Sequence, residues 1–294
     1  RMEEYPAEGT HERGELARCI RNGVEAMDSV FYELFLEKMC HCRPDALVSF
    51  YNQYPILAYW DRAAEKILRD MPKSSVEPGR VIAWHLYNMG YVFKTSTGCF
   101  GIDVNHRLSH KFADVLDFIL VTHNHGDHRS IALFKEMTRR GKKVVTNFHA
   151  ADGYMRPPKC LHFGDITVEV EENDHNATLK QFMAVYRVTC GKESNAPVIY
   201  HSGDTCCLEK FQPTGPIDIW IVHPRVGLDA VRGADYLLPK QIWFSHLWEM
   251  GHCRRTYMRP VDHWEAEEDI AKIHKNHPDI VGRIPFWGEK LSYP

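Results

Sequence analysis

The first 71 residues carry apolar side chains at steps of three and four, which is the period of an amphipathic helix. A second helical series begins near Pro55, a residue that fits the first turn of a helix, and it runs to Met71. The segment 71–79 then contains two prolines, two serines and a glycine, which predicts a turn-rich linker. We therefore expect residues 1–78 to form a helical extension that packs against the rest of the chain or forms the face of a homo-oligomer. The first apolar stripe consists of Leu16, Ile20, Val24, Met27, Phe31, Leu34 and Phe35.

From residue 80 onward the pattern changes to short apolar runs separated by turn residues, which is typical of strands. The segment 80–104 contains two such runs around the turn sequence TSTG, so it predicts a hairpin. Residues 130–141 predict an amphipathic helix, and 262–277 predict a late helix capped by Asp262. Strands interspersed with helices predict a mixed α/β domain with a layered core over residues 79–294. Further strands are expected at 118–122, 142–148, 165–173, 181–190, 197–202, 217–223 and 241–246.

The composition fits a protein with a sizeable core and no strong attraction to polyanions. The chain has 294 residues, of which 44% are hydrophobic, and a formal net charge of −3, which does not favour nucleic acid or an anionic membrane. The basic cluster Thr138–Lys143 is better explained by the favourable placement of cations at a helix C-terminus. No apolar stretch approaches the ~18 residues of a membrane span, and the start of the chain lacks an apolar signal core, so we expect a cytoplasmic protein. The nine cysteines are odd in number and lack disulfide spacing, which predicts reduced thiols.

Imidazole and carboxylate side chains directly follow several of the predicted strands. Strands packed side by side bring their ends to one rim of a sheet, where rigid elements can hold ligands in place. Imidazole and carboxylate are the groups that bind zinc and similar divalent ions. The pattern therefore predicts a metal site on this rim. The residues concerned are His123, His125, Asp127 and His128 after 118–122, Asp174 and His175 after 165–173, Asp204 after 197–202, and His246 at the end of 241–246.

These residues resemble the motifs of a known family. The segment Thr122–His128, T-H-N-H-G-D-H, closely resembles the T-H-x-H-x-D-H signature of the metallo-β-lactamase fold superfamily. The sequence GCFGIDV resembles that family's strand ending in aspartate, here Asp103, while YHSGDT resembles its S-G-D-T motif and FSH its last histidine. The resemblance covers residues 80–290. It implies an α/β fold of the four-layer αβ/βα sandwich type, with a two-metal site in the groove between its sheets.

The resemblance also implies a set of ligands for two divalent metal ions, with zinc expected first and manganese or iron as alternatives. Asp103 would not bind metal itself and would steady the ligand loop through hydrogen bonds. Each ion would keep a position open for water, as a catalytic site requires. The implied ligands are His123, His125 and His175 for one ion, Asp127, His128 and His246 for the other, and Asp204 as a bridge between both.

Several other residues leave parts of the site open. Asp174 is an alternative to His175 as the third ligand of the first ion, because both follow the same predicted strand. His149 and His162 compete with it on spacing, but the first ends a strand and the second precedes one, so structural roles are expected for both. The histidines that could face the substrate are His223 and His252.

The chemistry implied by such a site is hydrolysis. Two divalent ions ~3.5–4 Å apart lower the pKa of a shared water, and the resulting hydroxide attacks a carbonyl carbon or a phosphorus. Asp127 would orient that hydroxide, and Asp127 and Asp204 are the expected catalytic carboxylates. The N-terminal extension and the tryptophan-containing first strand look most like the branch that includes ascorbate-6-phosphate lactonase, so a small-molecule ester such as a lactone is the expected substrate. A phosphodiesterase or nuclease on the same site, and a mono-iron dioxygenase of the same fold, are the alternatives.

Overall fold

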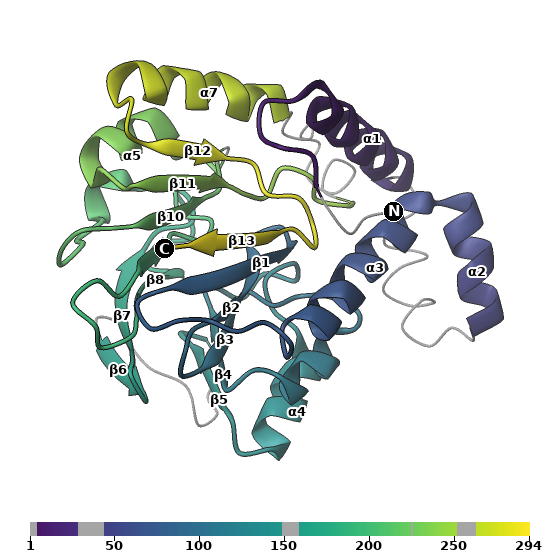
Figure 1. The fold of residues 1–294 in the computed structure, drawn as a ribbon, viewed down its shortest axis with the longest axis horizontal. Coiled ribbons are helices and arrows are strands. Elements are labelled where there is room, and N and C mark those ends of the chain that lie inside the picture. The colour runs from purple at the N-terminus through teal and green to yellow at the C-terminus, as the bar shows by residue number, and fades with distance from the viewer. Residues whose placement is uncertain (1–4, 29–43, 149–158, 225, 252–262) are drawn as a thin grey trace.

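Two β-sheets lie face to face at the centre of the molecule, and helices cover both outer surfaces (Figure 1). This arrangement of helix, sheet, sheet and helix is the four-layer α/β sandwich that the sequence predicts, so the expected fold class is confirmed. No helix in the ranges described combines the length and the apolar character that a bilayer crossing requires. The computed structural model describes residues 5–28, 44–148, 159–224, 226–251 and 263–294.

The first sheet has six strands in the order β13-β1-β2-β3-β4-β5, and the second has seven in the order β12-β11-β10-β9-β8-β7-β6. The strands of the first sheet are β1 (Val81–Tyr87), β2 (Gly90–Lys94), β3 (Cys99–Ile102), β4 (Phe118–Val121), β5 (Lys143–Thr146) and β13 (Lys290–Tyr293). Those of the second sheet are β6 (Lys159–Phe163), β7 (Ile166–Asn173), β8 (Met183–Cys190), β9 (Val198–His201), β10 (Ile219–Val222), β11 (Gln241–Phe244) and β12 (Val281–Arg283).

Strand β4, which leads into the histidine-rich loop, is buried along its whole length and pairs in parallel with β3 on one side and β5 on the other. A series of stacked rings packs against it, from Phe93 to Phe100 at 4.8 Å between ring centroids, to Phe118 at 5.3 Å and to Phe163 of the other sheet at 3.8 Å. Because close packing on both sides fixes β4, the loop after it starts from a rigid point.

Helices α3 (Pro55–Asp70) and α4 (Ile131–Arg139) cover the outer surface of the first sheet (Figure 1). Helices α5 (Ala230–Leu237) and α7 (His263–Asn276) cover that of the second. The start of α4 is capped by Ser130, whose Oγ accepts a hydrogen bond from the Leu133 backbone N–H at 3.3 Å. The helices predicted over 130–141 and 262–277 are therefore present, although the proposed cap Asp262 lies outside the described residues.

Helix α5 (Ala230–Leu237) is not predicted by the sequence pattern. It has a clear N-cap, because the Asp229 carboxylate accepts from the backbone N–H groups of Val231 and Arg232. Gly233 lowers the helical signal, since glycine disfavours a helix interior. The structure explains this glycine, because a Cβ there would lie 2.2 Å from the ring of Trp220 on the strand beneath.

The N-terminal region forms three helices, α1 (His11–Asp28), α2 (Pro44–Gln53) and α3 (Pro55–Asp70). The apolar residues of α1 and α3 belong to the same core cluster as Trp84 of β1, so this region packs on the first sheet. A buried ion pair between Arg13 and Glu289 adds a link between α1 and the segment before β13. The helical prediction is confirmed in the described part of the chain, while Phe31, Leu34 and Phe35 of the predicted stripe lie outside it.

The beginning of the sheet domain differs from the prediction of a single hairpin. The segment 80–104 forms three strands, because the chain also turns between β1 and β2 at Asn88, which has a left-handed φ of 49°. Strands β12 and β13 are not predicted, since they are short and β12 is half exposed. His162 precedes β7 as expected, but it lies within β6, a strand that the sequence pattern does not predict. There its side chain is exposed and contacts Thr167.

Candidate metal centre

The ends of four strands, from both sheets, bring all seven predicted ligands together. They form two groups, and within each group the candidate ligand atoms lie within 4.8 Å of one another. The loop after β4 supplies residues to both groups, and the strands of the second sheet supply the rest. The first group is His123, His125 and His175, and the second is Asp127, His128, Asp204 and His246.

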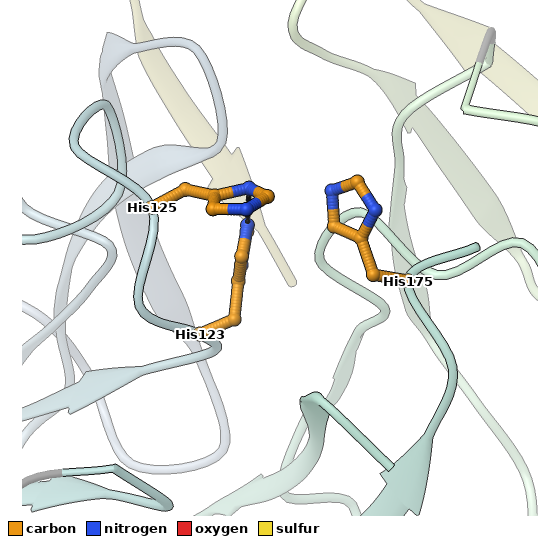
Figure 2. Close-up of side chains that lie close together, drawn as sticks. All are labelled: His123, His125 and His175. Carbon is orange, nitrogen blue, oxygen red and sulfur yellow. Dashed lines mark hydrogen bonds between the residues drawn. The ribbon is translucent and has the colours of Figure 1, made fainter. Parts of the chain in front are cut away.

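The first group consists of three imidazoles that face one another (Figure 2). His123 and His125 come from the loop after β4, and their Nε2 and Nδ1 atoms are 2.9 Å apart. His175 approaches from the end of β7 on the other side, with its ring centroid 4.6 Å from that of His125. Burial lowers the pKa of all three, most of all that of His123, so the neutral form that donates a lone pair to a metal is favoured.

The second group combines two carboxylates with two imidazoles. The His128 Nε2 atom lies 3.0 Å from Asp127 Oδ2 and 3.2 Å from Asp204 Oδ2. The His246 Nε2 atom lies 3.0 Å from Asp127 Oδ2 and 3.7 Å from Asp204 Oδ2. Burial opposes charge here, but the carboxylates still raise the pKa of His128 well above its ordinary value and that of His246 to about 9. Two acidic groups in a buried pocket thus attract positive charge strongly.

The Asp204 carboxylate connects the two groups. Its Oδ2 atom lies 3.2 Å from His128 Nε2 and 3.7 Å from His246 Nε2 in the second group. The same atom lies 4.0 Å from His123 Nε2 and 3.9 Å from His175 Nε2 in the first group. One oxygen therefore lies within 4.0 Å of four imidazole nitrogens, which come from three strand ends, those of β4, β7 and β11.

Unsatisfied polar atoms in the second group fit a cation. The buried His128 Nε2 and Asp204 Oδ1 atoms make no hydrogen bond of adequate geometry within the described residues, although imidazole and carboxylate atoms lie 3.0–3.4 Å away. Leaving such atoms without a partner in a buried site is costly, and a bound metal ion is one of the few partners that satisfies both. The donor set of imidazole nitrogen and carboxylate oxygen also suits zinc, iron or manganese. The residues of the second group therefore fit a divalent ion.

Asp103 supports this group from behind. Its carboxylate accepts hydrogen bonds from the Thr122 N–H at 2.8 Å, the Thr122 hydroxyl at 2.7 Å and His128 Nδ1 at 2.8 Å. Since Nδ1 of His128 donates to Asp103, its Nε2 carries the free lone pair in the neutral ring. These are the contacts that a residue steadying the ligand loop would make.

Asn88 also contacts the site, although no sequence motif points to it. Its Nδ2 donates to Asp127 Oδ2 at 3.2 Å, and its backbone carbonyl accepts from the His246 N–H at 3.2 Å. The side chain is buried and its Oδ1 atom lacks a hydrogen-bond partner among the described residues. The only local signal is an Asn-x-Gly turn, which marks a change of direction and gives no hint of a contact with a ligand loop.

The remaining candidate residues differ in whether they lie beside the two groups. His223 lies beside the second group, with Nδ1 at 3.4 Å from Asp204 Oδ1 and its ring stacked on that of His246 at 4.1 Å. The alternative third ligand Asp174 belongs to neither group, because its carboxylate pairs with Lys210 at 2.7 Å and with Lys180 at 3.1 Å. His149 and His252 lie outside the described residues.

Comparison with solved structures places this fold in a known class. A metallo hydrolase from the archaeon Ignicoccus hospitalis has a TM-score of 0.56 at 13% identity, over 73% of this chain and 99% of that one. The metallo-β-lactamase fold protein YhfI from Bacillus subtilis has a TM-score of 0.50 at 14% identity, over the same 73% and 99%. A variant of CmlA, a β-hydroxylase from Streptomyces venezuelae, has a TM-score of 0.51 at 13% identity, over 93% of this chain and 62% of that one. The chain therefore has the metallo-β-lactamase fold. No family model and no curated protein matches the sequence.

Proposed function

We propose that this protein is a metal-dependent hydrolase that cleaves a small-molecule ester with a metal-activated hydroxide. The observation that carries the proposal is the position of Asp204, whose Oδ2 atom lies within 4.0 Å of imidazole nitrogens from both groups. A carboxylate shared between two sets of ligands is the arrangement that a dinuclear hydrolytic site needs.

The ligands divide between two ions as the sequence motif implies. The first group would hold one ion and the second group the other, with Asp204 shared. When bound, two such ions lower the pKa of a shared water and polarise the oxygen of the substrate. Zinc fits this donor set best, and manganese and iron are alternatives.

The chain's own residues would orient the reactants. Asp127 is fixed by the Asn88 amide and lies next to His128 and His246, so its carboxylate is placed to accept a proton from water. His223 lies against Asp204 and restricts the orientation of that carboxylate. No serine or cysteine nucleophile is required.

A lactone is the substrate we favour within the ester class. This rests on the resemblance of the N-terminal extension and first strand to the ascorbate-6-phosphate lactonase branch. The Ignicoccus hospitalis neighbour, described as a metallo hydrolase, supports the hydrolase class and does not bear on the lactone.

Oxygen activation by iron is the second candidate function. It is favoured by the likeness to CmlA, which is described as a diiron β-hydroxylase. Imidazole and carboxylate ligands bind iron as well as zinc, so the donor set supports both functions.

The test combines metal analysis of the purified protein with activity assays on lactones, phosphodiesters and thioesters. We expect about two equivalents of zinc or manganese per chain and turnover of an ester that chelators abolish. Bound iron with oxygen consumption and no hydrolysis would favour the second candidate. Two metals that persist at full occupancy in an Asp204→Ala variant would show that Asp204 is not the bridge.

A further inference from the structure

Residues 103–109, which we call the bridging loop, lie between the candidate metal ligands and the N-terminal helices. Three of its side chains bind the loop and helix start that follow β4. Because each of these bonds reaches the segment 122–130, the path of the bridging loop fixes the path of the ligand loop. The contacts are Asp103 to His128 Nδ1 at 2.8 Å, Asn105 Nδ2 to the Gly126 carbonyl at 2.8 Å, and Ser109 Oγ to Ser130 Oγ at 2.6 Å.

His106 and Arg107 of the bridging loop bind α3. Arg107 Nε lies 2.8 Å from each carboxylate oxygen of Asp61, so the guanidinium and the carboxylate form a multidentate pair. His106 accepts a hydrogen bond from the Leu108 N–H at Nδ1, at 2.9 Å, so its Nε2 is the donor toward the Trp60 carbonyl at 3.3 Å. Two consecutive residues of the bridging loop therefore attach to two consecutive residues of α3.

Helix α2 joins the same cluster through Tyr51. Its hydroxyl donates to Asp61 and lies 3.1 Å from an Arg107 guanidinium nitrogen. The side chains of Asp61 and Arg107 are only 3% and 12% exposed. A buried multidentate pair of this kind fixes angle as well as position, which apolar packing alone does not do.

We propose that α2 and α3 position the metal centre through the bridging loop, with Asp61 and Arg107 as positioning residues. The connection runs from Asp61 to Arg107 by their ion pair and along the backbone of the bridging loop to Asn105 and Asp103. From there hydrogen bonds lead to Gly126 and His128. The inference rests on the proposed function, because it assumes that the second group binds metal. It assigns the N-terminal helices a role in metal affinity in addition to packing.

The effect should fall mainly on one ion. The one candidate ligand that the bridging loop is seen to contact directly is His128 of the second group. Its contacts beside the first group are with Thr122 and Gly126, which are not ligands. We therefore expect Asp61→Asn to weaken the ion held by Asp127, His128 and His246 by about tenfold, the lower end of the range for partners outside the ligand set. The ion held by the first group should change much less.

The experiment measures stepwise cobalt and zinc binding to the full chain by absorption and chelator competition. Asp70→Asn is the matched control, because Asp70 also lies on α3 and forms an ion pair, but with Lys66 of the same helix at 3.0 Å. Circular dichroism confirms that each variant is folded under the conditions of the titration. In a folded protein, lower global stability alone does not reduce metal affinity, so a loss specific to Asp61→Asn supports positioning.

The outcomes separate this inference from the proposed function. If the unaltered protein binds no pair of metals, the proposed function fails. If it binds two metals and Asp61→Asn binds both as tightly as Asp70→Asn does, the N-terminal helices only pack and the inference is wrong. Should Asp61→Asn fail to fold because Arg107 is left unpaired, the double variant Asp61→Leu with Arg107→Met removes both charges and should show the same selective loss.

Discussion

Replacing Asp103 by asparagine tests whether the hydrogen bonds behind the candidate ligands control metal binding. The carboxylate accepts from the Thr122 N–H, the Thr122 hydroxyl and His128 Nδ1, all at 2.7–2.8 Å. Asp103 is buried and has a φ of 49°, a conformation that asparagine also tolerates. The substitution therefore changes charge and hydrogen bonding with almost no change in shape.

The size of the effect follows from those bonds. Asparagine keeps one acceptor oxygen and places an NH2 group where the other was, so either the Thr122 N–H or the His128 Nδ1–H faces another donor. Losing one charge-assisted hydrogen bond lowers the free energy of unfolding by about 1.5–3 kcal/mol. Losing the partner that orients a metal-binding histidine lowers metal affinity by about 10–100-fold. We expect both changes in Asp103→Asn, with the second confined mainly to the ion held by Asp127, His128 and His246.

The assays are chelator competition for metal affinity and urea unfolding of the metal-free chain for stability. Asp117→Asn is the control, because the Asp117 carboxylate also accepts from a backbone N–H, that of Cys99 at 2.8 Å, at the opposite end of β4. A variant that loses stability but binds metal as tightly as the control would refute the view that Asp103 orients His128.

Three further results are expected. Asn88→Gly should weaken metal binding more than Asn88→Asp does in the same chelator assay. Both residues tolerate the turn's φ of 49°, but glycine only removes the amide that holds Asp127, whereas aspartate adds negative charge that attracts the cations. Equal losses would contradict this. Burial holds the pKa of His106 well below its ordinary value, so the ring is neutral when folded while the unfolded chain takes up a proton below pH ~6.5. The free energy of unfolding should therefore fall as pH drops below ~6.5, and this residue should contribute up to about 1.4 kcal/mol per pH unit. Urea unfolding of His106→Gln should lack this contribution to the pH dependence. Finally, removing metal with a chelator should lower the melting temperature. A metal at 100 times its Kd adds about 2.7 kcal/mol per site to the free energy of unfolding. An unchanged melting curve would argue against metal binding by the folded chain.

The candidate ligands could be located in the sequence because each follows a segment with a strand pattern. Apolar runs form β4, β9 and β11, and an alternating, half-buried segment forms β7. The ligands therefore appear in the chain as imidazole and carboxylate groups after predicted strands. Parallel pairing of β9 with β10 and of β10 with β11 then brings their ends to one edge. Here local pattern and tertiary geometry agree.

The supporting contacts could not be predicted in the same way. Asn88 and Asp127 are separated by 39 positions, and Asp61 and Arg107 by 46, so no periodicity within one element links them. Helix α5 is not predicted because it contains Gly233. The close approach of the Trp220 ring requires a glycine there, and that requirement comes from the tertiary structure. Residues whose conformation depends on a distant partner carry no local signal.

Backbone strain at the site shows how the two sheets depend on each other. Asn88, Asp103 and His246 all have positive φ values, of 49°, 49° and 63°, a conformation that costs roughly 1–3 kcal/mol for a residue other than glycine. Such conformations persist only where surrounding bonds hold them. For His246 that bond is the donation of its N–H to the Asn88 carbonyl, which belongs to the first sheet.

Two further bonds join the sheets near the same edge. His201 Nε2 lies 2.8 Å from the Met89 carbonyl, and the Ala184 N–H donates to the Thr122 carbonyl at 2.7 Å. His246 is thus held directly by a turn of the first sheet, and strands β8 and β9 are tied to the first sheet near the other candidate ligands. A change that separates the sheets at this edge should therefore weaken both ions together, whereas a change behind Asp103 should weaken mainly one. Stepwise metal titration distinguishes the two patterns, so it reports which support a given substitution has removed.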